Sequence, residues 1–401
     1  MMLKQSKTST PVLTERVQRV QPSATLTISA KAMALKAQGI DIISLSAGEP
    51  DFDTPDHIKE AGIQAIQKGQ TKYTPVDGTP ELKDAIVNKF SQDNNLLYQP
   101  ENILVSSGAK QTCFNLFQAI LEHGKEAVII SPYWVSYPDM VLLANGSPVI
   151  LKTSFENNFQ FNAEDLDSVL TENTHLLMLN SPSNPTGVTY TKDQYQIIAE
   201  VLKNYPNVLI ATDDMYEHIY WGEDKFYSFA EACPDLFERT ITINGVSKAY
   251  AMTGWRIGYC GGPPKIVAAM KKIQGQSTSN ASSVSQAAAV MALNGTHEPV
   301  HSMAREYERR HKFIFAALNE IRGFKTVAAT GAFYTFPEVI NAIEYLNLTD
   351  DIEFSDYLLE KARVAVVPGT AFGAKGHIRL SFATSMELLQ EAVNRIKEVL
   401  K

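Results

Sequence analysis

The hydrophobic residues fall into two patterns that alternate through the middle of the chain. Short runs rich in β-branched residues are typical of buried strands, and they occur at 101–107, 126–131, 147–152, 175–180, 207–213, 240–245 and 256–262. Between them, apolar residues recur with helical spacing at 110–124, 193–205 and 265–274. This alternation predicts an α/β fold, with a mostly parallel central sheet and helices on both faces.

The pattern changes after about Gly295. A long amphipathic helix is predicted over 300–321. Strands are then predicted within 324–339, 364–369 and 377–384, and helices at 355–363 and 386–401. We therefore expect a large domain over 56–294 and a smaller α+β domain made of 1–55 and 295–401. An active-site cleft is expected where the two meet.

Composition and charge narrow the possible functions. A net charge of −8 over 401 residues gives no basic surface for nucleic acid. Cys113, Cys233 and Cys260 lie far apart and form no CxxC pair, so we expect a reducing cytoplasm and neither a disulfide framework nor a zinc site. The eight histidines show no metal-ligand spacing, and no apolar run reaches the length of a membrane span.

The segment 244–263 carries the most specific candidate chemistry. Lys248 follows a predicted buried strand within a run of small residues, and Arg256 follows in a glycine-rich stretch. A lysine is usually a solvated surface group. At a strand end among small residues it can instead be desolvated, which lowers its pKa and makes the amine a better nucleophile. The planar fork of an arginine can bind two oxygens of one anion.

Other polar residues stand at the ends of predicted strands. Asp213 ends one strand, with Tyr216 three positions later, and Asn184 follows another in the turn SNPTG. A strand-end carboxylate is often only a helix cap, and a Pro-Thr-Gly turn is often only a turn. Gly108 and Ala109 open a helix, where small residues let backbone N–H groups approach an anion.

Four further residues have both a structural and a functional interpretation. Trp134 is either core or a ring that stacks on a flat cofactor. Arg379 lies in an apolar strand and needs a partner, which is either an internal salt bridge or a substrate carboxylate. Gly48 offers a close backbone approach to a substrate, and Tyr73 is either a site residue or ordinary packing.

Together these segments resemble class I aminotransferases, and most closely the prokaryotic aspartate aminotransferase subgroup, from about Arg16 to the C-terminus. The resemblance implies fold type I, the cofactor pyridoxal 5'-phosphate, and a homodimer with shared active sites. It also implies a ping-pong reaction that moves an amino group from L-aspartate to 2-oxoglutarate.

The same resemblance assigns roles to single residues. It implies that Lys248 forms the Schiff base with the cofactor and that Asp213 pairs the pyridine nitrogen. Tyr216 and Asn184 contact the ring oxygen, and Trp134 stacks on the ring. Arg256, Gly108 and Ala109 bind the phosphate, and Tyr73 reaches the phosphate of the neighbouring subunit. Arg379 binds the substrate α-carboxylate, with Gly48, Trp134 and Asn184 beside it.

The chain departs from the wider family at two places. Gly245 stands where many relatives have serine, which puts one phosphate hydrogen bond in doubt. From Ile273 to Ala304 there is no lysine or arginine, although animal-type relatives bind the distal carboxylate with an arginine. The prokaryotic subgroup implies Lys110 and Thr25 for that role. Lys110 is otherwise a solvated residue placed unfavourably in the first turn of a helix.

Alternatives stay open at this point. A nicotinamide dehydrogenase would need a GxGxxG turn and a hydrolase a GxSxG elbow, and neither motif is present. A catalytically inactive binding protein is possible on any fold. Within the family, aminotransferases for aromatic or other amino acids such as alanine, or for prephenate, and carbon–sulfur lyases are the alternatives. Prephenate is disfavoured because Gln21 stands where a basic residue would help.

Overall fold

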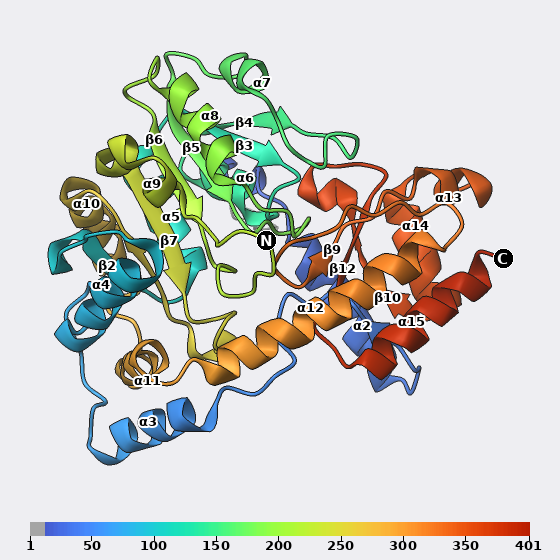
Figure 1. Cartoon of the computed structure of the whole chain (residues 1–401), viewed down its shortest axis with the longest axis horizontal. Coiled ribbons are helices and arrows are strands. Elements are labelled where there is room, and N and C mark those ends of the chain that lie inside the picture. Colours follow the sequence, from blue (N-terminus) through green and yellow to red (C-terminus); the bar gives the residue numbers. More distant parts are fainter. Residues whose placement is uncertain (1–12) are drawn as a thin grey trace, which may run out of the picture.

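The computed structural model describes residues 13–401. Figure 1 shows two lobes, one built around a large sheet and a smaller one with short strands among helices. The long helix α12 (Glu298–Asn319) runs from the first lobe to the second. Its amphipathic repeat explains this course, because buried Met303, Tyr307 and Ile314 contribute to the core of the smaller lobe.

The large lobe contains a seven-stranded sheet in the order β2-β8-β7-β6-β5-β3-β4. Its strands are β2 (Ile103–Ser106), β3 (Glu126–Ser131), β4 (Ser147–Lys152), β5 (Thr174–Asn180), β6 (Leu209–Asp213), β7 (Thr240–Gly245) and β8 (Gly258–Gly261). Only β8 is antiparallel to its neighbours, β2 and β7. Parallel pairing aligns Asn180 with Asp213, and Asp213 with Ile243, so β5, β6 and β7 end at one edge.

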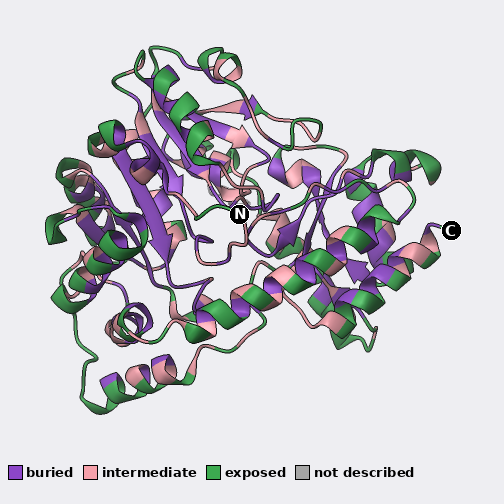
Figure 2. Cartoon of the chain, in the orientation of Figure 1, coloured by how far each residue is buried: buried purple, intermediate pink, exposed green. Residues whose placement is uncertain are grey.

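Helices cover both faces of this sheet. On one face lie α5 (Ala109–Ile120), α6 (Ser136–Leu143) and α10 (Pro264–Gly275). On the other lie α7 (Ala163–Asp167), α8 (Lys192–Leu202) and α9 (Phe229–Ala232). Figure 2 shows buried strands and helices exposed only on their outer sides. Burial on both faces explains why the strands are continuous apolar runs rather than alternating ones.

Three more helices flank the lobe: α3 (Asp56–Gln67), α4 (Pro80–Asn94) and α11 (Ser283–Asn294). They share a core with the antiparallel edge of the sheet, through Leu82, Phe90 and Ala288 among others. The start of α4 is fixed by Thr79, whose hydroxyl accepts from the backbone N–H of Leu82, with Pro80 in the first turn.

The smaller lobe joins the N-terminal segment to the C-terminal third. Its strands are β1 (Ile43–Ser44), β9 (Tyr334–Thr335), β10 (Val364–Ala365), β11 (Val367–Pro368) and β12 (Ile378–Ser381). Its α-helices are α13 (Ile340–Tyr345), α14 (Asp351–Tyr357) and α15 (Met386–Val399), and the N-terminal segment adds α2 (Ala24–Ala37). The short α1 (Glu15–Gln18) instead contacts α6 of the large lobe. Strand β1 pairs with β10, which attaches residues 43–44 to this lobe.

Residues 324–339 differ from the prediction, because only β9 forms a strand there. The backbone of residues 330–332 bonds to loops of the large lobe instead. Thr330 and Gly331 donate to the carbonyl of Gly187, and Ala332 donates to that of Ile219. These bonds tie the two lobes together beside the cleft.

The α/β architecture and the smaller α+β unit are as predicted. The domain boundaries at 56 and 294 remain predictions, and residues 1–12 of the proposed small domain lie outside the described part of the chain. None of the described helices is long and apolar enough to cross a membrane.

Candidate active site

One cavity of about 560 Å³ lies at the carboxyl ends of β5, β6 and β7. That volume is within the usual range for small-molecule sites. The residues around it come from both lobes and include nearly all of those singled out in the sequence, namely Thr25, Gly48, Ala109, Lys110, Trp134, Asn184, Asp213, Tyr216, Lys248, Arg256 and Arg379. Parallel strands deliver their side chains to this edge, which is where ligands bind in open α/β sheets.

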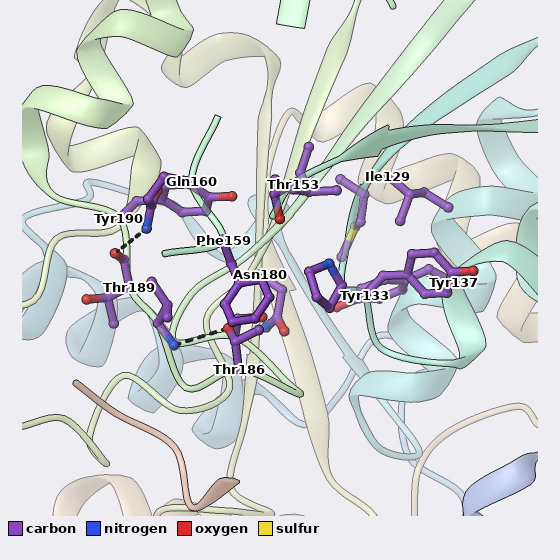
Figure 3. Close-up of a pocket in the computed structure, with 15 residues that line it drawn as sticks. Ile129, Tyr133, Tyr137, Thr153, Phe159, Gln160, Asn180, Thr186, Thr189 and Tyr190 are labelled. Carbon is purple, nitrogen blue, oxygen red and sulfur yellow. Dashed lines mark hydrogen bonds between the residues drawn. The ribbon is translucent and has the colours of Figure 1, made fainter. Parts of the chain in front are cut away.

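A second cavity shares Asn180 with the first but is far smaller, at about 30 Å³. Figure 3 shows its wall, where Gln160 donates to the carbonyl of Thr189, and the hydroxyl of Thr186 accepts from the backbone of Val188. A space of this size holds a water molecule but no amino acid. The larger cavity is therefore the candidate active site.

Lys248 lies in the loop that follows β7 and lines the large cavity. Its Nζ donates to the backbone carbonyl of Gly48 over 2.6 Å, which joins the two lobes at this point. Desolvation, and then the charge of Arg379, lower the pKa of Lys248 to about 8. The amine is therefore available as a nucleophile or base near neutral pH.

Asp213 is buried at the end of β6. Among the described residues its carboxylate accepts from the hydroxyl of Tyr137 at 2.6 Å and from the backbone N–H of Met215 at 3.4 Å. Burial raises the pKa of Asp213 above its ordinary value, although the bond from Tyr137 opposes this effect. A cationic ring nitrogen against this carboxylate would reverse that shift.

Tyr216 lies three residues after Asp213, and its hydroxyl is 2.9 Å from the hydroxyl of Tyr334. Burial raises the pKa of Tyr216 well above its ordinary value, so the hydroxyl stays protonated and can donate. The Lys248 Nζ lies 6.0 Å from the centre of the Tyr216 ring. The tyrosine and the lysine therefore face the same part of the cavity.

Arg379 enters the cavity from β12 and is 2% exposed. Its Nη1 donates to the Asn184 side chain at 2.9 Å, and its Nη2 donates to the Ser46 carbonyl at 2.7 Å. Its Nε is buried with no hydrogen-bond partner among residues 13–401. No carboxylate neutralises this guanidinium within that range, so the internal salt bridge considered for Arg379 does not form. A free carboxylate is a suitable ligand.

The start of α5 and Arg256 form the other end of the cavity. Gly108 precedes the helix with a φ of 89°, and a Cβ built there would lie 2.2 Å from Nη2 of Arg256. Only glycine permits this approach between backbone and guanidinium. Backbone N–H groups and an arginine fork together make a good anion site.

Lys110 and Thr25 line the same cavity from α5 and α2. The Lys110 Nζ lies 5.0 Å from the centre of the Trp134 ring. Partial desolvation, and then Arg256, lower the pKa of Lys110. Two neighbouring cations repel each other, so an anionic ligand between Lys110 and Arg256 is favoured.

Tyr73 and Gly245, two positions named from the sequence, differ from the residues that line the cavity. Tyr73 is 92% exposed and does not line the cavity of its own chain. At Gly245 an added Cβ would lie 3.0 Å from both the Gly258 Cα and the Ile257 carbonyl oxygen. The close antiparallel neighbour β8 thus leaves little room for a side chain there.

Tyr137 and Tyr334, which bond to Asp213 and Tyr216, were not predicted as site residues. The centre of the Tyr334 ring also lies 4.5 Å from the Arg379 Cζ. Both tyrosines sit in apolar segments, where packing is the ordinary interpretation of an aromatic residue. Their contacts span 76 and 118 positions, so no local signal could have indicated them.

A model of the family "Aminotransferase class I and II" matches residues 40–396. The chain belongs to this family. The class I resemblance and the fold-type I prediction are therefore confirmed. The aminotransferase is 53% identical over 394 residues to the aspartate/prephenate aminotransferase of Nitrosomonas europaea, covering 97% of this chain and 99% of the relative. It is also 46% identical to the aspartate aminotransferase of Bacillus sp. strain YM-2, covering 97% of this chain and 99% of the relative.

Solved structures agree with this placement. The aspartate aminotransferase from Rhizobium meliloti has a TM-score of 0.92 and 44% identity, covering 97% of this chain and 98% of the other. The aspartate aminotransferase from Thermus thermophilus with maleate has a TM-score of 0.91 and 43% identity, covering 98% of this chain and 100% of the other.

The lowered pKa of Lys248 gives a testable prediction. In the cofactor-free protein, an amine-reactive reagent should modify Lys248 with half-maximal rate near pH 8. Exposed lysines, with ordinary pKa values of about 10.4, should react only at higher pH. Peptide mass spectrometry over a pH series measures both rates. A midpoint for Lys248 as high as that of exposed lysines would contradict the desolvated site.

Proposed function

We propose that this aminotransferase moves the amino group of L-aspartate to 2-oxoglutarate, giving oxaloacetate and L-glutamate, with pyridoxal 5'-phosphate as cofactor. One observation carries the proposal. The desolvated amine of Lys248, the buried carboxylate of Asp213 and the guanidinium of Arg379 meet in one cavity. Each of these groups needs a ligand of complementary chemistry, and this cofactor with an amino acid supplies all three.

The side chains around the cavity fit this cofactor. Lys248 would hold its aldehyde carbon, and Asp213 would keep its pyridine nitrogen protonated. Tyr216 and Asn184 would bond to its ring oxygen, and Trp134 would cover its face. Gly108, Ala109 and Arg256 would hold its phosphate through backbone N–H groups and the guanidinium fork. The close approach of Gly108 to Arg256 supports this assignment, because a Cβ there would displace the guanidinium from the start of α5.

Different residues of the chain have different roles in the reaction. When bound, the cofactor supplies an electron sink that stabilises negative charge at the substrate α-carbon. Once the substrate amine has displaced it from the aldehyde carbon, the free Nζ of Lys248 would be the base that takes the proton from the α-carbon, and a pKa of about 8 suits that role. Asp213 maintains the charge that makes the sink effective. The same groups serve the second keto acid, so the kinetics are ping-pong.

The two carboxylates of aspartate need two cationic partners. Arg379 would bind the α-carboxylate beside Gly48, Asn184 and Trp134. Lys110, assisted by Thr25, would bind the distal one. The Thermus thermophilus relative at 43% identity has been solved with maleate, which is itself a four-carbon dicarboxylate. The maleate complex of that relative supports the proposal that the site of this chain binds two negative charges.

We further propose a cytoplasmic homodimer. Tyr73 is exposed in its own chain, and α3 presents the exposed apolar residues Ile63 and Ile66 nearby in the sequence. A second copy placed over this face would bury them and could receive Tyr73 at its phosphate site. Free, buried Cys113, Cys233 and Cys260 fit a reducing compartment.

Prephenate is a second candidate substrate. The relatives at 47–53% identity include several named aspartate/prephenate aminotransferase or probable aspartate/prephenate aminotransferase. In this chain Gln21 occupies the position where a basic residue was expected to help. Comparing kcat/KM for prephenate and 2-oxoglutarate, each with aspartate as donor, separates the two functions.

The variant Asp213→Asn tests the role of the buried carboxylate. It keeps the shape of the side chain but removes the charge, so proton removal from aspartate should slow by roughly two orders of magnitude or more. Single-turnover kinetics with aspartate, followed by visible absorbance, measure this step. Near-normal rates in the variant would show that Asp213 does not pair with the cofactor ring.

The variant Lys110→Ala tests the distal carboxylate site. Truncating one partner of a buried charge pair costs roughly 2–5 kcal/mol, so kcat/KM for aspartate and glutamate should fall strongly. Values for neutral or aromatic amino acids should change little. Arg379→Ala serves as the comparison, because it should weaken every amino-acid substrate. Equal losses for aspartate and alanine in Lys110→Ala would assign Lys110 a general or structural role.

A further inference from the structure

A buried ion pair lies behind the active site and is not used by any step described above. Lys89, from α4, is 5% exposed, and Glu217, from the loop after β6, is 6% exposed. The Lys89 ammonium bonds directly to Glu217 Oε1. A lysine and a glutamate are rarely this deeply buried. Removing both charges from water is costly unless every remaining bond is made.

Two asparagines complete the bonding of this pair. Asn94 Nδ2 donates to Glu217 Oε2 at 2.8 Å, and Asn94 Oδ1 accepts from Lys89 Nζ at 2.6 Å. Asn244 Nδ2 donates to Glu217 Oε1 at 2.7 Å. Burial alone would raise the pKa of Glu217, but Lys89 and then His218 hold it below its ordinary value. Glu217 is therefore an anion with partners on both oxygens.

A metal-binding site explains this cluster less well than an ion-pair network does. The ligand atoms of Asp93, Glu217 and His218 lie within 4.8 Å of one another. However, the Lys89 ammonium already bonds to Glu217 and lies 3.8 Å from Asp93. A metal ion there would be repelled by this cation. The cluster is a closed ion-pair network.

The network joins the two chain segments that carry the reactive groups. Glu217 directly follows Tyr216, which lines the cavity. Asn244 is the penultimate residue of β7, four residues before Lys248, and its Oδ1 accepts from the backbone N–H of Gly245 at 2.7 Å. Through these bonds Glu217 fixes the loop after β6 to the end of β7. Helix α4 supplies the cation that holds Glu217 in place.

We propose that Lys89, Glu217 and Asn244 are positioning residues that set the placement of the Tyr216 hydroxyl relative to Lys248. This inference rests on the function proposed above. Errors of about 1 Å in such a placement can cost roughly a hundredfold in rate. The Tyr216 hydroxyl would donate to the cofactor ring oxygen and so compete with the lysine nitrogen for it. A displaced hydroxyl would let that nitrogen keep its proton to higher pH.

The test uses Glu217→Gln in the holoenzyme, with Asn244→Ala as a milder variant that leaves the ion pair intact. For Glu217→Gln, the pH midpoint of the cofactor's visible absorbance should rise by roughly half a unit or more. The kcat with aspartate should fall roughly tenfold or more, while KM stays within about twofold because Arg379 and Lys110 are untouched. Asn244→Ala should shift the midpoint in the same direction by less.

The matched control is Asp351→Asn. Asp351 is also fully buried and accepts from Thr370 N at 2.7 Å, Thr370 Oγ1 at 2.9 Å and Gly376 N at 3.1 Å, but none of these residues lines the active-site cavity. It should lower Tm without moving the midpoint or kcat. If both test variants only lower Tm as Asp351→Asn does, the positioning role is wrong while the proposed function stands. If the wild-type protein showed neither visible absorbance nor transamination, both the positioning role and the proposed function would be wrong.

Discussion

The desolvated amine of Lys248 is the constraint on which the rest of the site depends. An ammonium group held in a cavity beside Arg379 and Arg256 is disfavoured, because burial and like charge both oppose the proton. The chain tolerates this because the Gly48 carbonyl accepts from the amine and because Glu49 and Asp213 supply opposite charge. The result is an amine that is partly neutral near physiological pH, at the cost of a less favourable folded state.

The fold explains why this amine meets its partners. Strands β5, β6 and β7 run parallel, so Asn184, Asp213 and Lys248 follow three strand ends that lie side by side. The smaller lobe closes the site with Arg379 from β12 and Gly48 from the segment after β1. Both lobes are thus needed for one chemical centre, and the bonds from residues 330–332 to the large lobe help hold them in register.

Much of this arrangement could be predicted from the sequence, because the strands of a parallel sheet are buried on both faces and appear as short apolar runs. The strand ends then indicated Asp213, Asn184 and Lys248. Contacts between distant segments could not be predicted in this way. Tyr137 and Tyr334 look like core residues in a linear pattern, and the Lys89–Glu217 pair joins positions that share no motif. Continuous strands were wrongly predicted over 324–339, where only β9 forms one, since the backbone of residues 330–332 bonds to loops of the other lobe.

The most direct test of the central claim is chemical. The purified protein, supplied with pyridoxal 5'-phosphate, would be reduced with borohydride, digested and mapped by mass spectrometry. The account predicts loss of the visible absorbance and a single modified peptide, with the cofactor attached to Lys248. Attachment at another lysine, or no stable attachment at all, would contradict it.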